Sequence, residues 1–213
     1  MDQNPYAAPK VELVDARAPE PFLSGNWNAG GLRVLAGLSL ALLLSELVLL
    51  GLSIVNRLPG FFGIPQLEVW LSVLSVLLGC FLSWRCTRFL EDRFSARGLR
   101  WPLAISIGMA VLMQLHSLVF DVQFGEVNSL ATLAFLLMFL PSGIAQLWYG
   151  IRVLKIPLPY PSVKVMGWFD VVTGGCLATV VLFVPGTLLA MVGAIPLALM
   201  FLRGARELDG ATG

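Results

Sequence analysis

The stretch VLAGLSLALLLSELVLLGLSIV, from Val34 to Val55, decides the fold. Its only charged side chain is Glu46, and about 20 apolar residues are enough for a helix to cross the hydrocarbon core of a bilayer. A helix that is apolar on all sides must be covered by lipid or by other helices. The stretch therefore predicts a membrane-spanning helix.

The rest of the chain has the same apolar character. Of its 213 residues, 57% are hydrophobic and 13% are charged, which is more apolar surface than one soluble core can bury. The net charge at pH 7 is +1, so no excess of positive charge points to nucleic acid as a partner. We expect an all-α, polytopic transmembrane bundle whose main partner is the lipid bilayer.

Further apolar stretches follow the first one. The last of them, from Met166 to Leu202, is too long for one ordinary helix, and Val184-Pro185-Gly186 interrupts it with turn-forming residues. A break at these residues gives six spans, although the last span is short enough to leave five spans or a re-entrant final pair open. The expected spans are 34–55, 67–84, 101–120, 130–151, 166–183 and 187–202.

Basic residues predict the orientation, because cytoplasmic loops of membrane proteins hold an excess of Lys and Arg. With six spans and both termini inside, 13 of the 14 basic residues lie on the cytoplasmic side, and only Arg57 lies outside. Five spans would move Arg203 and Arg206 outside, so the charge asymmetry favours six. We predict a transmembrane domain at 31–203 and a cytoplasmic C-terminal tail at 204–213.

The first thirty residues differ from the rest. They contain four prolines, six charged residues and no long apolar run, so we expect residues 1–30 to form a disordered cytoplasmic tail. The tail opens with Asn4-Pro5-Tyr6-Ala7-Ala8-Pro9, which resembles the Asn-Pro-Tyr-x-x-Pro opening of small, uncharacterised bacterial inner-membrane proteins. The resemblance covers six residues and implies a location in the bacterial inner (cytoplasmic) membrane, but no activity.

Five arginines gather between the second and third expected spans. Phe89, Leu90 and Phe94 separate them and are placed to face lipid while the arginines reach towards headgroup phosphates. We expect an interfacial or protruding helix that follows the topology rule, with recognition of anionic lipid or of a partner as the alternative. The residues of this headgroup-binding hypothesis are Arg85, Arg88, Arg93, Arg97 and Arg100.

Glu46 lies near the middle of the first span, where an ionisable group costs about 2.5 to 3.5 kcal/mol on insertion scales. We therefore predict that Glu46 points into the bundle and meets His116 of the third span. Such a pair could relay protons, whereas a neutral carboxyl with one hydrogen bond would satisfy the same pattern without any function. The predicted intramembrane polar cluster consists of Glu46, Gln114, His116 and Gln146.

Asp170 lies just inside the fifth expected span, beside Trp168. Because tryptophan prefers the membrane interface, we expect this carboxylate to stay near headgroup water or to meet Lys164 or Arg152. Its predicted role is that of a solvated boundary charge.

Small residues spaced four apart predict where the spans pack, because they let helix backbones approach closely in lipid. They pack either the bundle itself, which we favour, or a homo-oligomer. The stripes are Gly37, Ala41 and Ser45 on the first span, Ser75, Gly79 and Ser83 on the second, and Gly186, Ala190, Ala194 and Ala198 on the last.

Motifs for catalysis are not convincing. Ser142 lacks the preceding glycine of rhomboid-type intramembrane proteases, and the His116-to-Asp121 spacing of acyltransferases would place these residues about 140° apart on a helix. We therefore expect no enzyme. The cysteines lack a Cys-x-x-Cys spacing, so we also expect no metal site, no disulfide and no cofactor; they are Cys80, Cys86 and Cys176.

Three functional classes remain open. The sequence favours a non-catalytic membrane scaffold that anchors or modulates a membrane-protein partner, because the chain carries no recognisable chemistry. A small transporter, channel or proton-coupled element built around the Glu46 cluster is the second class. A membrane-embedded enzyme of lipid or envelope metabolism is the third.

Overall fold

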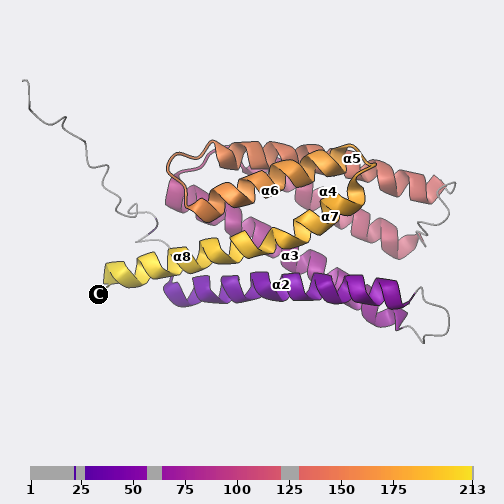
Figure 1. The fold of residues 1–213 in the computed structure, drawn as a ribbon, viewed down its shortest axis with the longest axis horizontal. Coiled ribbons are helices and arrows are strands. Elements are labelled where there is room, and N and C mark those ends of the chain that lie inside the picture. Colours follow the sequence, from indigo (N-terminus) through magenta and orange to yellow (C-terminus); the bar gives the residue numbers. More distant parts are fainter. Residues whose placement is uncertain (1–21, 23–26, 57–63, 121–129, 213) are drawn as a thin grey trace, which may run out of the picture.

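The computed structural model describes residues 22, 27–56, 64–120 and 130–212, which form an all-helical bundle (Figure 1). Five helical segments are long and apolar enough to cross a membrane: Ala29–Val55, Gln66–Phe94, Arg100–Val119, Leu130–Leu154 and Phe183–Gly210. The chain is thus a membrane protein of several apolar helices. Its helices are α2 (Ala29–Val55), α3 (Pro65–Phe94), α4 (Arg100–Val119), α5 (Leu130–Leu154), α6 (Pro161–Ala178), α7 (Phe183–Val192) and α8 (Ala194–Thr212).

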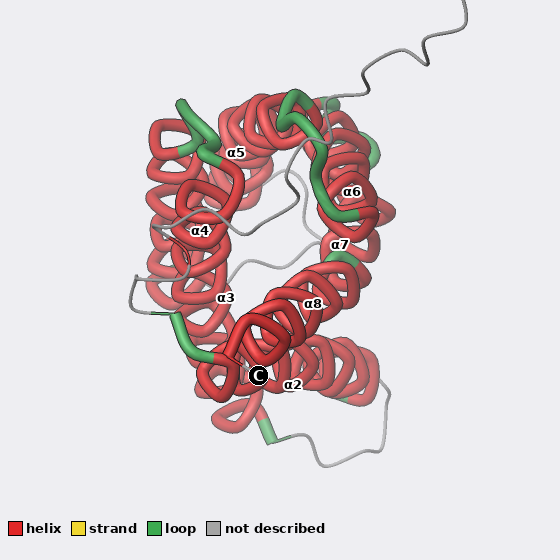
Figure 2. Tube along the Cα trace, turned by 90° about the vertical axis from the view of Figure 1, so that its left-hand side faces the viewer, coloured by secondary structure: helices red, strands yellow, loops and turns green. Residues whose placement is uncertain are grey.

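The helices form a ring when viewed along their axes (Figure 2). Helices α2 to α6 each pack on the next in the chain, and α8 closes the ring by packing along α2. One end of the ring contains the starts of α2, α4 and α6 and the ends of α3, α5 and α8 (Figure 1). We call it the basic end, because the arginines and lysines of the described residues lie towards it.

The break near the C-terminus lies earlier than the sequence predicts. Helix α6 ends at Ala178, and a turn in which Val180 has a φ of 60° leads into α7 at Phe183. Pro185 does not break a helix, because it is the third residue of α7, where a backbone N–H needs no intrahelical partner. The expected break at 184–186 is therefore wrong. Helix α6 itself is not among the five long apolar segments.

Several ends of the predicted spans also need correction. Helix α3 continues to Phe94, so much of the expected arginine loop is the last part of this helix. Helix α8 continues to Thr212, so residues 204–212 are helical and not a tail. Within the predicted disordered tail, Phe22 and Trp27 are buried and α2 already begins at Ala29, while residues 1–21 and 23–26 lie outside the described residues.

The best-packed region of the protein is a group of aromatic rings at the basic end. Phe89 lies at its centre and is fully buried, which contradicts the expectation that it faces lipid. The centroid of its ring lies 5.5 Å from that of Phe22, 5.6 Å from Trp27 and 5.8 Å from Phe201, each in an edge-to-face arrangement. We call this group the aromatic clasp; its members are Phe22, Trp27, Phe89, Phe94, Tyr160 and Phe201.

Polar contacts close the rim of the aromatic clasp. The Nε of Arg93 on α3 donates a hydrogen bond of 2.9 Å to Glu207 on α8, and the hydroxyl of Tyr160 donates to the same carboxylate. Burial, together with this carboxylate, raises the pKa of Tyr160 above its ordinary value, so its hydroxyl stays protonated and can donate at neutral pH. Arg93 therefore joins α3 to α8.

The remaining arginines of the headgroup hypothesis have varied surroundings. Arg100 forms an ion pair with Glu91 through a 2.9 Å contact. Arg85 lies over the ring of Trp27 at 4.4 Å, and Arg88 over that of Trp84 at 5.2 Å. Arg97 is exposed. Because Arg93 and Arg100 already contact carboxylates, the five arginines do not form one uniform phosphate-binding surface.

Helices α5 and α6 approach backbone to backbone through two glycines on each helix, spaced seven residues apart: Gly143 and Gly150 on α5, and Gly167 and Gly174 on α6. A Cβ atom on Gly143 would lie 2.4 Å from the backbone nitrogen of Ala178, and one on Gly174 would lie 2.4 Å from that of Leu147. Only residues without a side chain fit there. The predicted stripe on α2 packs only in part: Gly37 and Ala41 are exposed, whereas Ser45 hydrogen-bonds with Ser75 on α3.

Candidate functional site

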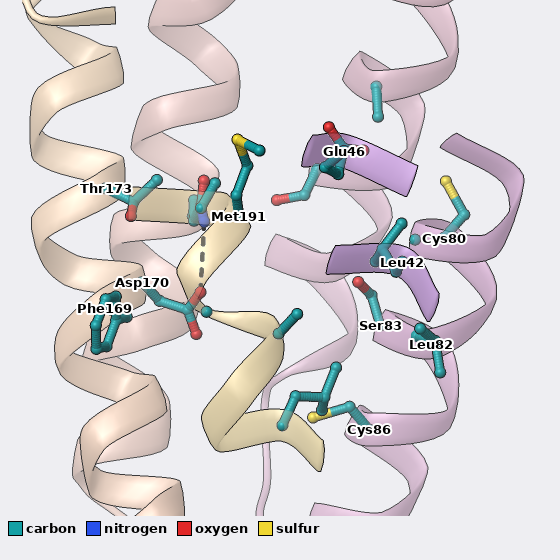
Figure 3. A pocket seen from close by; sticks show the side chains of 18 of the residues that line it. Leu42, Glu46, Cys80, Leu82, Ser83, Cys86, Phe169, Asp170, Thr173 and Met191 are labelled. Atoms are coloured by element: carbon teal, nitrogen blue, oxygen red, sulfur yellow. Dashed lines mark hydrogen bonds between the residues drawn. The ribbon is translucent and has the colours of Figure 1, made fainter. Parts of the chain in front are cut away.

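A cavity of about 450 Å³ lies inside the ring (Figure 3). Its walls contain residues from every helix from α2 to α8. Cys86 and Met166 belong both to the wall of the cavity and to the hydrophobic core around the aromatic clasp. The cavity therefore begins where the tight packing of the basic end stops.

Two carboxylates enter the cavity from opposite sides. Glu46 projects from α2, and Asp170 projects from α6 across the cavity from it (Figure 3). The side-chain amide of Gln146 on α5 donates a long hydrogen bond of 3.4 Å to Asp170, whereas Glu46 has no hydrogen-bond or ion-pair partner among the described residues. No lysine, arginine or histidine of the described residues lines the cavity.

The other wall residues mix hydroxyls with apolar groups. Ser75 on α3 lines the cavity and shares a 2.8 Å hydrogen bond with Ser45 on α2, which ties these two helices together at this depth. Ser142, Thr173 and Thr187 add hydroxyl groups from α5, α6 and α7. Apolar surface comes mainly from side chains such as Leu42, Leu103, Phe169 and Met191. The cavity is thus an amphipathic chamber with acidic groups on two walls.

The structure divides the predicted polar cluster. Glu46 and Gln146 line the cavity, but Gln114 and His116 do not. Gln114 donates a 3.1 Å hydrogen bond to Ser72 on α3. The ring of His116 packs against Phe120 and Phe135, with centroid distances of 4.7 and 5.8 Å, and its buried Nδ1 has no partner among the described residues.

The predicted pair of Glu46 and His116 is therefore not formed. The reason is the order of helices in the ring: α2 packs on α3 and α8, whereas α4 packs on α3 and α5. Helix α3 lies between the two residues. A shared depth in the membrane is not enough to bring two side chains together when their helices are not neighbours.

Asp170 is the site residue whose role the sequence analysis missed. It does not meet Lys164 or Arg152 in the described structure; its hydrogen-bond partner is Gln146, inside the bundle. A signal for this was present, because Asp170 follows Gly167 by three residues and precedes Gly174 by four, and residues at these spacings share one helix face. Since both glycines pack on α5, Asp170 is drawn to the interior.

No protein-family model, curated protein or solved structure matches this chain. The class of protein therefore follows from geometry alone: a helical membrane protein whose helices border a cavity with acidic side chains in its walls. Within such a chamber, unpaired carboxylates can accept hydrogen bonds, hold a proton or balance the charge of a bound cation.

Proposed function

We propose that this protein is a small solute transporter of the bacterial inner membrane, with six spans and both termini in the cytoplasm. The observation that carries the proposal is the cavity of about 450 Å³ that is bordered by α2 to α8 and lined by Glu46, Gln146 and Asp170. Cavities of about 300 to 1,000 Å³ are typical of small-molecule sites. Membrane transporters commonly hold their solute near the middle of the bilayer.

The cost of the polar residues supports this function over a scaffold. A carboxyl group at the middle of a span costs about 2.5 to 3.5 kcal/mol on insertion scales, so such residues mark solute and proton pathways in membrane proteins. A protein that only anchors a partner gains nothing from an unpaired Glu46 facing an internal chamber. Apolar side chains of the same size would fill that space and hold the ring more firmly.

The arrangement of charge supports the proposed topology. The basic residues of the described chain lie towards the end of the ring that contains the ends of α3, α5 and α8, as the positive-inside rule requires of a cytoplasmic face. In a protein whose Cys80, Cys86 and Cys176 are replaced by alanine, a single cysteine introduced at Ser95 or Gly210 should react with an impermeant maleimide only in inside-out vesicles. Labelling of Gly210→Cys in intact cells would overturn the six-span, both-ends-inside topology.

The native Cys80 tests whether the cavity serves a solute, because it lines the cavity wall. Thiols react with methanethiosulfonate reagents as thiolates, so the reaction needs access to water. In a variant with Cys86→Ala and Cys176→Ala, we expect Cys80 to be modified by ethylammonium methanethiosulfonate. The matched control is Leu44→Cys with Cys80 also replaced, because Leu44 is 63% exposed on the outer surface of α2 and therefore faces lipid.

We expect opposite reactivities for the thiols of the two variants. Cys80 should react at least ten times faster than the cysteine at position 44, and the rate should depend on the side from which the reagent is added. If both thiols are equally inert, the chamber is not open to solutes, and the scaffold function is favoured instead.

A further inference from the structure

We infer that the solute of this cavity is a small organic cation of the ammonium type, which binds between the carboxylates of Glu46 and Asp170. The inference rests on the proposed function of the cavity and adds the chemical class of its ligand. It is carried by the charge of the cavity wall, by the missing partner of Glu46 and by the composition of the remaining wall.

The charge of the wall selects a cation. Glu46 and Asp170 are the acidic side chains among the lining residues, and no basic side chain of the described residues opposes them. An anionic solute would be repelled by both walls. A neutral solute offers no counter-charge, so in its presence each carboxyl group would either bear the cost of an isolated charge at low dielectric or take up a proton. A cation bound between them removes this cost and makes charge-assisted hydrogen bonds.

The missing partner marks where the cation binds. Glu46 lines the cavity but accepts no hydrogen bond from any described residue, and Asp170 accepts only the 3.4 Å bond from Gln146. Both residues are half-buried, and Gln146 is the described residue that donates to them, so their oxygens are open to donors from a ligand. Figure 3 shows that the two carboxylates occupy different depths, with Asp170 nearer to Cys86 and the basic end. An ammonium group can therefore remain close to an acidic group as it moves along the chamber.

The remaining wall favours an organic cation over a metal ion. A metal ion needs several oxygen ligands on one side to replace its water shell. The described residues contain no group of three or more His, Cys, Asp or Glu side chains that could hold a metal ion. Leu42, Phe169 and Met191 instead offer apolar and aromatic surface to a hydrocarbon body. The cavity volume of about 450 Å³ leaves space for such a body next to the charged group.

The experiment measures protection of Cys80 in the Cys86→Ala, Cys176→Ala protein, reconstituted in nanodiscs. The probes are two matched sets: butylammonium, butanol and butyrate, and benzylammonium, benzyl alcohol and benzoate. The reagent is a neutral methyl methanethiosulfonate, so that the reagent itself does not compete for the acidic groups. We expect at least one ammonium probe to slow the reaction of Cys80 at a concentration at least tenfold lower than the corresponding alcohol requires. Butyrate and benzoate should not slow the reaction.

Substitutions then test the two carboxylates. Glu46→Gln and Asp170→Asn should each weaken protection by the ammonium probe at least tenfold while leaving the unprotected rate within about twofold. The matched control is Glu68→Gln, because Glu68 lies on α3 outside the cavity and bonds with Asn56. This control should leave protection unchanged. Thermal unfolding of each variant confirms that it is folded before protection is measured.

The outcomes separate this inference from the function on which it rests. If Cys80 reacts but the alcohols protect it as well as the ammonium probes, or no ammonium probe protects it, the ligand class is wrong while the open chamber stands. Protection that persists in both Glu46→Gln and Asp170→Asn also overturns the inference. A Cys80 that does not react at all contradicts the proposed function itself.

Discussion

Helix α3 passes through two regions that are built in opposite ways. Near its end, Phe89 is fully buried among aromatic rings from three other parts of the chain: Phe22 and Trp27 before α2, Tyr160 before α6 and Phe201 on α8. About two turns earlier along the same helix, Gly79, Cys80 and Ser83 border the cavity. The aromatic clasp is filled, and the chamber beside it is left open.

The difference indicates how stability and function are divided in this bundle. Aromatic pairs contribute about 0.5 to 1.5 kcal/mol each beyond their buried area, so the aromatic clasp can hold the ring together at one end. The close glycine contacts between α5 and α6 hold one wall along its length. With the helices fixed by these contacts, the protein can tolerate an unfilled, acidic chamber between them.

Loss of the central ring of the aromatic clasp should have the largest effect on stability. Phe89→Ala removes a fully buried phenyl ring, and such substitutions cost about 3 to 5 kcal/mol. We expect a large decrease in the melting temperature in detergent, measured by thermal unfolding. The control is Phe81→Ala on the same helix, because Phe81 is 47% exposed and faces outwards. Equal melting temperatures for the two variants would contradict the central role of the clasp.

The next largest effect should come from the glycines between α5 and α6. Gly174→Ala places a methyl group 2.4 Å from the backbone nitrogen of Leu147, which forces the helices apart and costs about 1 to 3 kcal/mol. Gly175→Ala is the matched control, because a Cβ there meets nothing within 4 Å. Thermal unfolding should separate these adjacent substitutions. A Gly174→Ala protein as stable as Gly175→Ala would show that the two helices are not in such close contact.

A smaller effect is expected from the ion pair at the rim of the aromatic clasp. Arg93→Gln should destabilise the protein by about 1 to 2 kcal/mol, because the pair with Glu207 is partly shielded from water, with side chains 14% and 29% exposed. Arg33→Gln breaks the Arg33–Asp209 pair, whose side chains are 58% and 47% exposed, and should cost below about 1 kcal/mol. If Arg33→Gln destabilised the protein more than Arg93→Gln, the Arg33–Asp209 pair would contribute more to the stability of the basic end than the ion pair at the aromatic clasp.

The smallest effect on stability should come from the cavity. Glu46→Gln keeps the size of the side chain and removes an unpartnered carboxyl group, so we expect the melting temperature to be unchanged or slightly raised. Ligand protection falls in the same variant, which separates a functional residue from a structural one. A marked loss of stability in Glu46→Gln would mean that this carboxylate holds the bundle together, and the contrast between clasp and chamber would fail.

Part of the candidate site could be recognised before the structure. Glu46 is an isolated acidic residue within a long apolar span, and its cost in lipid alone indicates that it faces the interior. Gln146, predicted to belong to the same polar cluster, lines the cavity, where it donates to Asp170. Asp170 was misread because its distance from the start of a predicted span suggested water, whereas its spacing from Gly167 and Gly174 placed it on the packed face.

The sequence by itself determined that the chain is helical and lies in a membrane, because hydropathy is a local property that accumulates along each segment and needs no knowledge of neighbours. Only the tertiary structure decided which helices touch. It placed α3 between Glu46 and His116, brought Asp170 opposite Glu46 and buried Phe89 in the aromatic clasp. Lipid tails are as apolar as the surfaces of the spans, so hydrophobicity does not select which helices pack together, and the selection depends on close contacts between particular faces.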